Sequence, residues 1–384
     1  MKIVFLTTDN RDHFRNSTDP IPVFGPAPDA LLRGFALLPE VEVHIITCAR
    51  RPLPAPENLA PNLVFHSVFV PQIGWMRTLF QGCVRAVRKK VRELGADIVH
   101  GQGTEGHNAL AAALSSFPNV ATIHGNMRAI ARLERPRPFT YNWLAARLEG
   151  WAIPRNDGVV CITRHAQEEV RGLARRTWVV PNAVDTSFYQ VNAEPAPDVP
   201  AKILCLGRVR PLKNQIALIR AMDPVANNRR FDLVFVGGAD EAEPYGAEFA
   251  ALVKARSWCS RIGHSTREKL QVLLKKASLL VLPSLEENCP MVVLEAMAAG
   301  VPVVGAKVGG VPDLIEEGRT GWFCDPRDGE SMRKAIETAL ANPAVAAEVA
   351  RLAQERALER FHPKSVAQRH VEIYREVIAS RGGH

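Results

Sequence analysis

The order of apolar and polar positions along the chain predicts two rounds of strands alternating with helices. Short apolar runs are typical of buried parallel strands. In the first half they occur at 2–8, 41–47, 63–71, 96–103, 119–126 and 157–163. In the second half they occur at 202–208, 231–238, 260–264, 279–283 and 301–305. Helical patterns separate them at 30–39, 76–94, from 214, at 246–256, at 266–277 and at 365–379. This alternation predicts an α/β protein with two doubly wound parallel sheets.

The length of the chain supports two domains. At 384 residues it exceeds one typical domain. Pro181 marks the expected joint, and a polar, proline-rich linker follows at 191–201. We therefore predict an N-terminal domain over 1–180 and a C-terminal domain over 181–362, with a final helical segment at 363–384.

The predicted helix at 76–94 is strongly amphipathic. Its apolar positions recur with helical spacing, and its other face carries Arg85, Arg88, Lys89, Lys90 and Arg92. With a formal net charge of +8, such a helix is suited to peripheral contact with an anionic membrane. The alternative is an ordinary surface helix whose apolar face packs on the sheet.

Composition limits the remaining classes of function. The first residues, 1–13, read as a strand and not as a signal peptide, and no apolar run approaches the roughly 20 residues that span a bilayer. Seven cysteines lack any Cys-x-x-Cys pair, which favours reduced thiols in a cytoplasmic protein. There is no Asp-x-Asp sequence, no histidine pair at metal-ligand spacing and no nucleic-acid-binding motif.

The unit at 283–304 is the main candidate for chemistry. Here a buried strand leads into a loop that carries Glu287, and a helix beginning near Pro290 carries Glu295. Ligands of such units bind beyond the carboxyl ends of the strands, and free N–H groups at the helix start favour anions. A carboxylate accepts two hydroxyls at once, which suits the vicinal diols of a sugar or ribose. The alternative is two solvated surface charges.

The segment 206–215 is a second candidate. Gly207 follows a strand, and Arg208 and Lys213 precede the helix that starts at Asn214. A guanidinium and an ammonium near a helix start can bind a diphosphate. The alternative is a pair of surface charges beside a turn.

These two segments together resemble the donor site of the family 4 retaining glycosyltransferases. The resemblance rests on two glutamates with seven residues between them, on the following Ala-Met-Ala-x-Gly-x-Pro-Val-Val, and on Gly-Arg with a lysine five residues after the arginine. It implies the GT-B fold, in which two Rossmann-like domains face a deep interdomain cleft. It also implies that the terminal helix at 363–384 returns to the first domain.

The resemblance assigns further residues to the donor site. It implies that Arg208 and Lys213 neutralise the diphosphate, that Glu287 holds the sugar hydroxyls and that Glu295 holds the ribose. It places His124, at a strand end, near the donor sugar, and leaves His100 as a packing residue. The glycine turn at Gly237, the nucleobase contacts and the helix-start amides complete the expected set, namely Arg261, Ile262, Asn288, Cys289, Met291 and Val292. Gly309 and Gly310 either approach the donor or serve a loop requirement.

The expected function is metal-independent transfer of a hexose from a UDP- or GDP-sugar to a hydroxyl acceptor, with retention of configuration. The acceptor is a sugar or lipid-linked hydroxyl of glycan, polysaccharide or glycolipid synthesis. Two alternatives remain open, a nucleotide-sugar epimerase of the same shape and a non-catalytic sugar-nucleotide-binding subunit. One departure concerns the acceptor side, because the loop at 19–28 has only Gly25 among prolines where the family often has a Gly-Gly turn. Either this loop is stiffer or the acceptor pocket differs.

Overall fold

The computed structural model describes residues 1–12, 19–194 and 200–382. The chain forms two compact units, one made of Met1–Ala183 with His362–His384 and the other of Val184–Phe361. Part of the predicted linker, 195–199, and part of the predicted irregular stretch before Asp29, 13–18, lie outside the described residues.

The first unit is built on a sheet of eight strands. All neighbouring strands are parallel except the edge pair β3–β4. Their spatial order is β3 (Asn58–Ala60), β4 (Leu63–Phe69), β2 (Glu42–Ala49), β1 (Lys2–Leu6), β5 (Ile98–Gln102), β6 (Asn119–Ile123), β7 (Gly158–Cys161) and β8 (Thr177–Val179). Its helices are α1 (Pro26–Ala36), α2 (Gln81–Leu94), α3 (Asn108–Ala113), α4 (Met127–Glu134), α5 (Tyr141–Ala152), α6 (Arg164–Glu169) and α13 (Pro363–Gly382).

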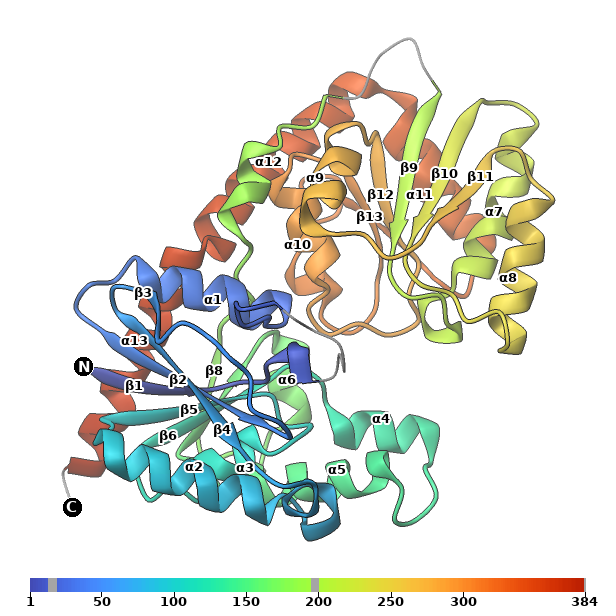
Figure 1. Cartoon of the computed structure of the whole chain (residues 1–384). Helices are drawn as coiled ribbons and strands as arrows, with labels where there is room; N and C mark the ends of the chain where they lie inside the picture. Colours follow the sequence, from blue (N-terminus) through green and yellow to red (C-terminus); the bar gives the residue numbers. More distant parts are fainter. Residues whose placement is uncertain (13–18, 195–199, 383–384) are drawn as a thin grey trace. The chain divides into compact units, whose positions relative to one another are not determined.

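Alternate residues of the central strand feed two separate cores. Ile3 and Phe5 pack in a cluster with apolar residues of α1 and α13, whereas Val4 and Leu6 pack with α2 and α3. Successive side chains of a strand point to opposite faces, so a strand covered on both faces reads as a continuous apolar run. Figure 1 shows α2 and α3 on one side of this sheet and α1 and α13 on the other.

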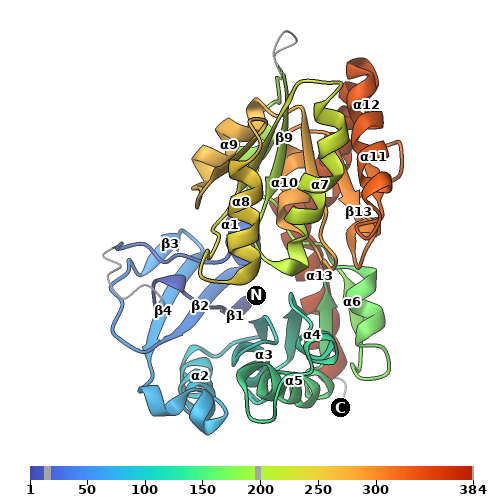
Figure 2. The ribbon, with the colours of Figure 1, turned by 90° about the vertical axis from the view of Figure 1, so that its right-hand side faces the viewer.

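The second unit contains a fully parallel sheet of six strands. Their order is β11 (Cys259–Ile262), β10 (Phe231–Val236), β9 (Ala201–Leu206), β12 (Leu279–Leu282), β13 (Val303–Ala306) and β14 (Trp322–Cys324). Its helices are α7 (Gln215–Ala226), α8 (Pro244–Lys254), α9 (Arg267–Lys275), α10 (Met291–Ala298), α11 (Gly329–Ala341) and α12 (Pro343–Phe361). Figure 2 shows α11 and α12 side by side. The predicted α/β class with two doubly wound sheets is confirmed.

The predicted helix at 76–94 is wrong in its first turn. Residues Met76–Thr78 form a 3-10 turn, Leu79 and Phe80 have left-handed backbones with φ of 51° and 62°, and α2 starts only at Gln81. Phe80 is nevertheless buried, because the reversal turns its ring into the core. The apolar face of α2 packs in that core too, as the sheet-packing alternative requires.

One smaller feature also differs from the sequence-based expectation. Helix α1 starts at Pro26 rather than Ala30, with prolines in its first turn, where a missing N–H costs no helical hydrogen bond. Among the described residues, no helix has the length and apolar content that crossing a bilayer requires.

A close contact between α1 and α13 generates the first prediction. A Cβ atom on Gly34 would lie 2.1 Å from the Pro363 carbonyl oxygen, so the two helices would have to separate. We expect Gly34→Ala to lower the free energy of unfolding by about 1–3 kcal/mol, although alanine is the better helix former. Chemical denaturation of the purified protein measures this change.

Gly150→Ala is the matched control for this prediction. Gly150 also lies inside a helix, but the nearest atom to its added Cβ would be Arg128 Cδ at 3.6 Å, an ordinary contact. We expect this variant to be neutral or more stable by up to about 1 kcal/mol. Equal changes in both variants would contradict the proposed backbone contact.

Candidate functional site

The strand order of the second unit creates a switch point between β9 and β12. From β9 the chain proceeds through β10 to the edge strand β11, and then returns to the other side of β9 to form β12 and β13. In open parallel sheets, ligands bind at the carboxyl ends of the strands flanking such a point. The loops there are 207–214 and 283–290, which contain the two sequence motifs.

Main-chain and side-chain hydrogen bonds join these two loops. The Leu285 N–H donates to the Leu212 carbonyl at 2.9 Å, and the Asn214 amide donates to the Pro283 carbonyl at 3.1 Å. Asn214 adopts a left-handed backbone with φ of 60° at the start of α7. The motifs, about seventy residues apart in sequence, therefore form one local structure.

Two predicted site residues contact each other directly. The Lys213 ammonium forms an ion pair with the Glu287 carboxylate, and both side chains are largely buried. The Ser284 hydroxyl donates a second hydrogen bond to the same carboxylate oxygen of Glu287 at 2.7 Å. Such charge-assisted bonds fix the position of the carboxylate in the loop.

Arg208 differs from Lys213 in having an uncommitted charge. Its side chain is exposed, and none of the hydrogen bonds or ion pairs among the described residues involves its guanidinium. Only its carbonyl is engaged, by the Gln215 amide at 3.1 Å. The guanidinium is therefore available for an anion at the switch point.

Glycines hold the surrounding backbone at close range. Gly207 and Gly237 have φ of 142° and 153°, and a Cβ on Gly237 would lie 2.1 Å from the Gly207 carbonyl oxygen. Gly309 has φ of 49°, and its added Cβ would lie 1.8 Å from the Glu287 carbonyl oxygen. The Gly310 N–H donates to that same oxygen at 3.0 Å. These contacts with the Glu287 carbonyl support the alternative that the loop itself requires Gly309 and Gly310.

The helix-start residues lie where the sequence predicts. Pro290 is the N-cap of α10, and the preceding Asn288 and Cys289 form the end of the loop. Met291 and Val292 make up the first turn and are half-buried. The amides of a helix start lack partners within the helix, so this end of α10 can bind an anion or hydroxyl oxygens.

Glu295 lies one turn into α10 and is almost fully buried. Its exposed fraction is 8%, and burial raises its pKa to about 7, only partly offset by Arg267. No described residue donates a hydrogen bond to its carboxylate. Arg267 in turn forms an ion pair with Asp185 at 2.9 Å. Sequence reasoning missed Asp185 and Arg267, because neither belongs to a recognisable motif.

Arg261 and Ile262 lie on the edge strand β11. Arg261 forms an ion pair with Glu241 at 3.0 Å, and the Ile262 side chain is 38% exposed. The Ile262 carbonyl accepts a hydrogen bond from the Gly237 N–H at 3.0 Å. These two residues therefore lie at the end of β11, next to Gly237 at the end of β10. The loops that carry Lys213 and Glu287 follow β9 and β12, further along the same edge of the sheet.

His124 belongs to the first unit, at the end of β6, where it is part of a buried hydrogen-bonded network. Its Nε2 lies 2.8 Å from Gln102 Oε1. The Gln102 amide nitrogen lies 2.9 Å from His100 Nε2, and His100 Nδ1 lies 2.5 Å from the Tyr374 hydroxyl. Burial and the neighbouring His370 lower the pKa of His124 to about 4, so its imidazole is neutral at pH 7. His100 is completely buried, as expected of a packing residue.

The proline-containing loop before α1 is held by a buried charge pair that the sequence did not reveal. Arg11 and Asp9 are both almost fully buried and form an ion pair at 2.7 Å. The Arg11 guanidinium also donates to the carbonyls of Asp19 and Pro54. Gly25 has φ of −63°, a conformation open to any residue, so this loop does not form a glycine-dependent turn.

Comparison with known proteins identifies the two units separately. Residues 31–188 match Glycosyltransferase Family 4, and residues 190–356 match Glycosyl transferases group 1. A glycogen synthase of Mycobacterium tuberculosis is 27% identical over 330 residues, which cover 81% of this chain and 77% of the relative.

Solved structures with the same fold cover nearly the whole chain. Sucrose-phosphate synthase from Thermosynechococcus elongatus superposes with a TM-score of 0.78 at 21% identity, covering 99% of this chain and 100% of that one. Anabaena HepE in complex with UDP and glucose gives a TM-score of 0.72 at 20% identity, covering 98% and 100%.

The raised pKa of Glu295 predicts a pH-dependent stability. Its ordinary pKa is 4.5 and its folded value is about 7, so between these values the folded chain binds more protons than the unfolded chain. The free energy of unfolding should therefore fall as pH rises from about 4.5 to about 7. Glu295→Gln should remove roughly 1–3 kcal/mol of this fall.

Denaturant titrations across this pH range measure the effect. Glu359→Gln, a change at an exposed carboxylate on α12, serves as the control and should keep the wild-type profile. If the stability profile of Glu295→Gln also matched that of the wild type, titration of Glu295 would not be the cause of the fall in stability with pH.

Proposed function

The chain belongs to the family 4 glycosyltransferases and has their GT-B fold, and from this premise we propose a specific reaction. The protein transfers a hexose from a nucleotide-diphosphate sugar to a hydroxyl acceptor with retention of anomeric configuration. The observation that carries the proposal is the uncommitted guanidinium of Arg208, which shares the switch-point loop 207–214 with Lys213, the partner of Glu287. UDP is the first candidate nucleotide, because the HepE structure holds UDP and glucose.

The leaving group of this reaction is a nucleoside diphosphate, whose developing negative charge must be stabilised. Arg208 offers a planar fork of donors for phosphate oxygens. An ammonium has three donors, so Lys213 can keep Glu287 and still bind an oxygen of the diphosphate. With the amides at the start of α10, these groups supply a preorganised positive field without a metal ion.

The remaining donor contacts of the proposal are those that the family resemblance implies. Glu287, held by Ser284 and Lys213, accepts hydrogen bonds from hydroxyls of the transferred sugar, together with nearby helix-start amides. None of the residues that the structure describes donates a hydrogen bond to the Glu295 carboxylate, and it accepts the two ribose hydroxyls when the nucleotide binds. Gly237, Arg261 and Ile262 line the nucleobase. The amides that bind the sugar hydroxyls together with Glu287 are those of Asn288, Cys289, Met291 and Val292.

His124 contributes from the first unit as a neutral imidazole. Gln102 fixes the His124 ring by accepting from Nε2–H, which leaves Nδ1 without the proton. His124 then positions the donor sugar. The bond between the anomeric carbon and the phosphate oxygen breaks while the acceptor oxygen bonds to the same face of that carbon. The acceptor proton passes to the departing phosphate oxygen, so no protein base is required.

The two alternatives differ from this reaction in what they consume. An epimerase would convert the sugar nucleotide without an acceptor, and a binding subunit would release no nucleoside diphosphate at all. Transfer requires nucleoside diphosphate release that depends on the acceptor.

The same proposal places the enzyme in the cytoplasm, at the membrane surface if its acceptor is lipid-linked. The seven cysteines form no disulfide in the structure, as reducing conditions would keep them. The apolar face of α2 is used by the core, so α2 would contact anionic lipid through exposed charges alone, namely Arg85, Lys89 and Arg92.

The donor proposal is tested by calorimetric binding of UDP, GDP, ADP and TDP with a chelator present. We expect one nucleotide to bind the wild type tightly and to bind Arg208→Ala far more weakly. Turnover of the corresponding sugar donor should fall on the order of 10²–10³-fold in this variant, as for the loss of one preorganised anion donor. Product anomers read by NMR test retention.

Arg220→Ala is the control for the donor proposal. Arg220 is an exposed arginine on α7 that pairs with Glu248 of α8, and its removal should leave binding unchanged. A loss of turnover below about threefold in Arg208→Ala would argue against a leaving-group role. Absence of binding to every nucleotide would end the donor-site proposal.

Lipid contact is tested by flotation with vesicles containing anionic lipid. We expect co-flotation at low salt that declines as salt screens the charges. Charge reversal of Arg85, Lys89 and Arg92 together should abolish it, whereas reversal of Arg171 and Arg175, which are exposed elsewhere in the first unit, should not. Wild-type protein that stays at the bottom at low salt would end the lipid proposal and leave the donor proposal intact.

A further inference from the structure

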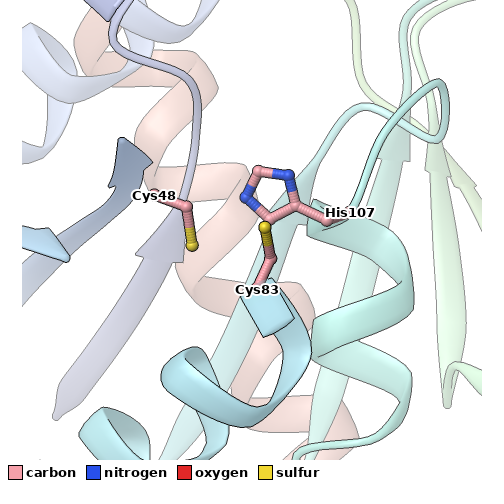
Figure 3. A group of neighbouring side chains, drawn as sticks. All are labelled: Cys48, Cys83 and His107. Carbon is pink, nitrogen blue, oxygen red and sulfur yellow. The ribbon is translucent and has the colours of Figure 1, made fainter. Parts of the chain in front are cut away.

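Two cysteines and a histidine meet inside the first unit, whereas the donor motifs belong to the second unit. Cys48 lies near the end of β2, Cys83 in the first turn of α2, and His107 at the N-cap of α3. Their ligand atoms all lie within 4.8 Å of one another, and all three side chains are buried. Figure 3 shows the two sulfur atoms and the imidazole ring turned toward one another.

The separation of these atoms suits a metal ion. A zinc ion binds sulfur at about 2.3 Å and imidazole nitrogen at about 2.0–2.1 Å, so ligand atoms around one tetrahedral zinc lie roughly 3.3–3.8 Å apart. Atoms that already lie within 4.8 Å can therefore close on a cation by small side-chain rotations. Their backbones belong to three different elements and need not move.

The charges also favour a divalent cation of the zinc type. Two thiolates and a neutral imidazole balance a 2+ ion, so the bound cluster carries no net charge. Neutrality matters here because Cys48 and Cys83 belong to an apolar core with Trp75 and Phe80. Thiolate and imidazole are the ligands that zinc prefers.

The histidine ring is already oriented. Trp75 packs edge-on against it with ring centroids 5.4 Å apart, and Phe80 lies at 5.9 Å. Trp75 is itself fixed by a hydrogen bond from its indole N–H to the Val70 carbonyl at 3.0 Å. None of the hydrogen bonds among the described residues involves a ring nitrogen of His107.

We propose that Cys48, Cys83 and His107 form a zinc site that joins β2, α2 and α3. Three protein ligands leave the fourth position of the tetrahedron to a water molecule. The site stabilises the first unit by connecting the end of one strand to the starts of two helices. It is separate from the donor chemistry, and neither proposal depends on the other.

The experiment uses full-length protein carrying no histidine tag, because such a tag binds zinc. Protein is stripped of metal under a non-metal-binding reductant, reloaded with zinc, desalted and analysed for metal content. We expect one zinc per chain in the wild type and in Cys161→Ser, which removes a lone buried cysteine of β7. Cys83→Ser and His107→Ala should lose the bound zinc.

Two further measurements on the wild-type protein test the proposal if a variant fails to fold. Cobalt(II) added to the stripped wild type should give a thiolate-to-cobalt charge-transfer band in the near-ultraviolet. Zinc should also raise the Tm of the wild type and of Cys161→Ser, because a ligand that binds only the folded state stabilises it.

Clear outcomes would overturn the proposal. These are no retained zinc in the wild type, no thiolate band with cobalt, or equal zinc retention in wild type and Cys83→Ser. Formation of a Cys48–Cys83 disulfide on mild oxidation, without metal uptake by the reduced protein, would mean that the cluster is a thiol pair and not a metal site.

Discussion

The common direction of the six strands in the second unit is the constraint on which its candidate site depends. Parallel strands need crossover connections, and right-handed crossovers leave the following loops at one edge of the sheet. Because β9 and β12 are neighbours from which the chain departs in opposite directions, their loops meet without an intervening helix. Arg208, Lys213 and Glu287 are therefore placed by topology first and by their own interactions second.

Electrostatics then gives each of these side chains a different state. Lys213 and Glu287 satisfy each other in a partly buried setting, which holds the loop, while Arg208 keeps its charge in solvent. Burial raises the pKa of Glu295 toward neutrality. A ligand that brought hydroxyl donors to Glu295 would lower that pKa, because hydrogen bonds to a carboxylate favour its charged form. The charge state of Glu295 and the binding of such a ligand are thus linked.

The first unit depends on a segment from the far end of the chain. Helix α13 supplies Tyr374 to the buried network that continues through His100 and Gln102 to His124. The same helix approaches α1 at Gly34, where no side chain fits. The orientation of His124 is therefore set by residues more than two hundred positions away, through hydrogen bonds that no local pattern shows.

The sequence by itself determined the α/β class and the positions of the longer strands, because a buried parallel strand is a continuous apolar run. It did not predict the three-residue strands β3, β8 and β14. It also predicted Arg208, Lys213, Glu287 and Glu295 as site residues, since residues after a strand and at a helix start lie at the ligand edge of a sheet. It misjudged the start of α2, where left-handed Leu79 and Phe80 keep the apolar spacing of a helix without its backbone.

Tertiary structure alone decided which of these residues touch and how deeply they are buried. The Lys213–Glu287 pair, the Asp185–Arg267 pair beside Glu295 and the Cys48–Cys83–His107 cluster each join residues distant in sequence. Spacing along a chain cannot report such contacts, because they follow from how the strands are ordered and how the helices pack. A pKa shift, in turn, follows from burial, which exists only in the folded chain.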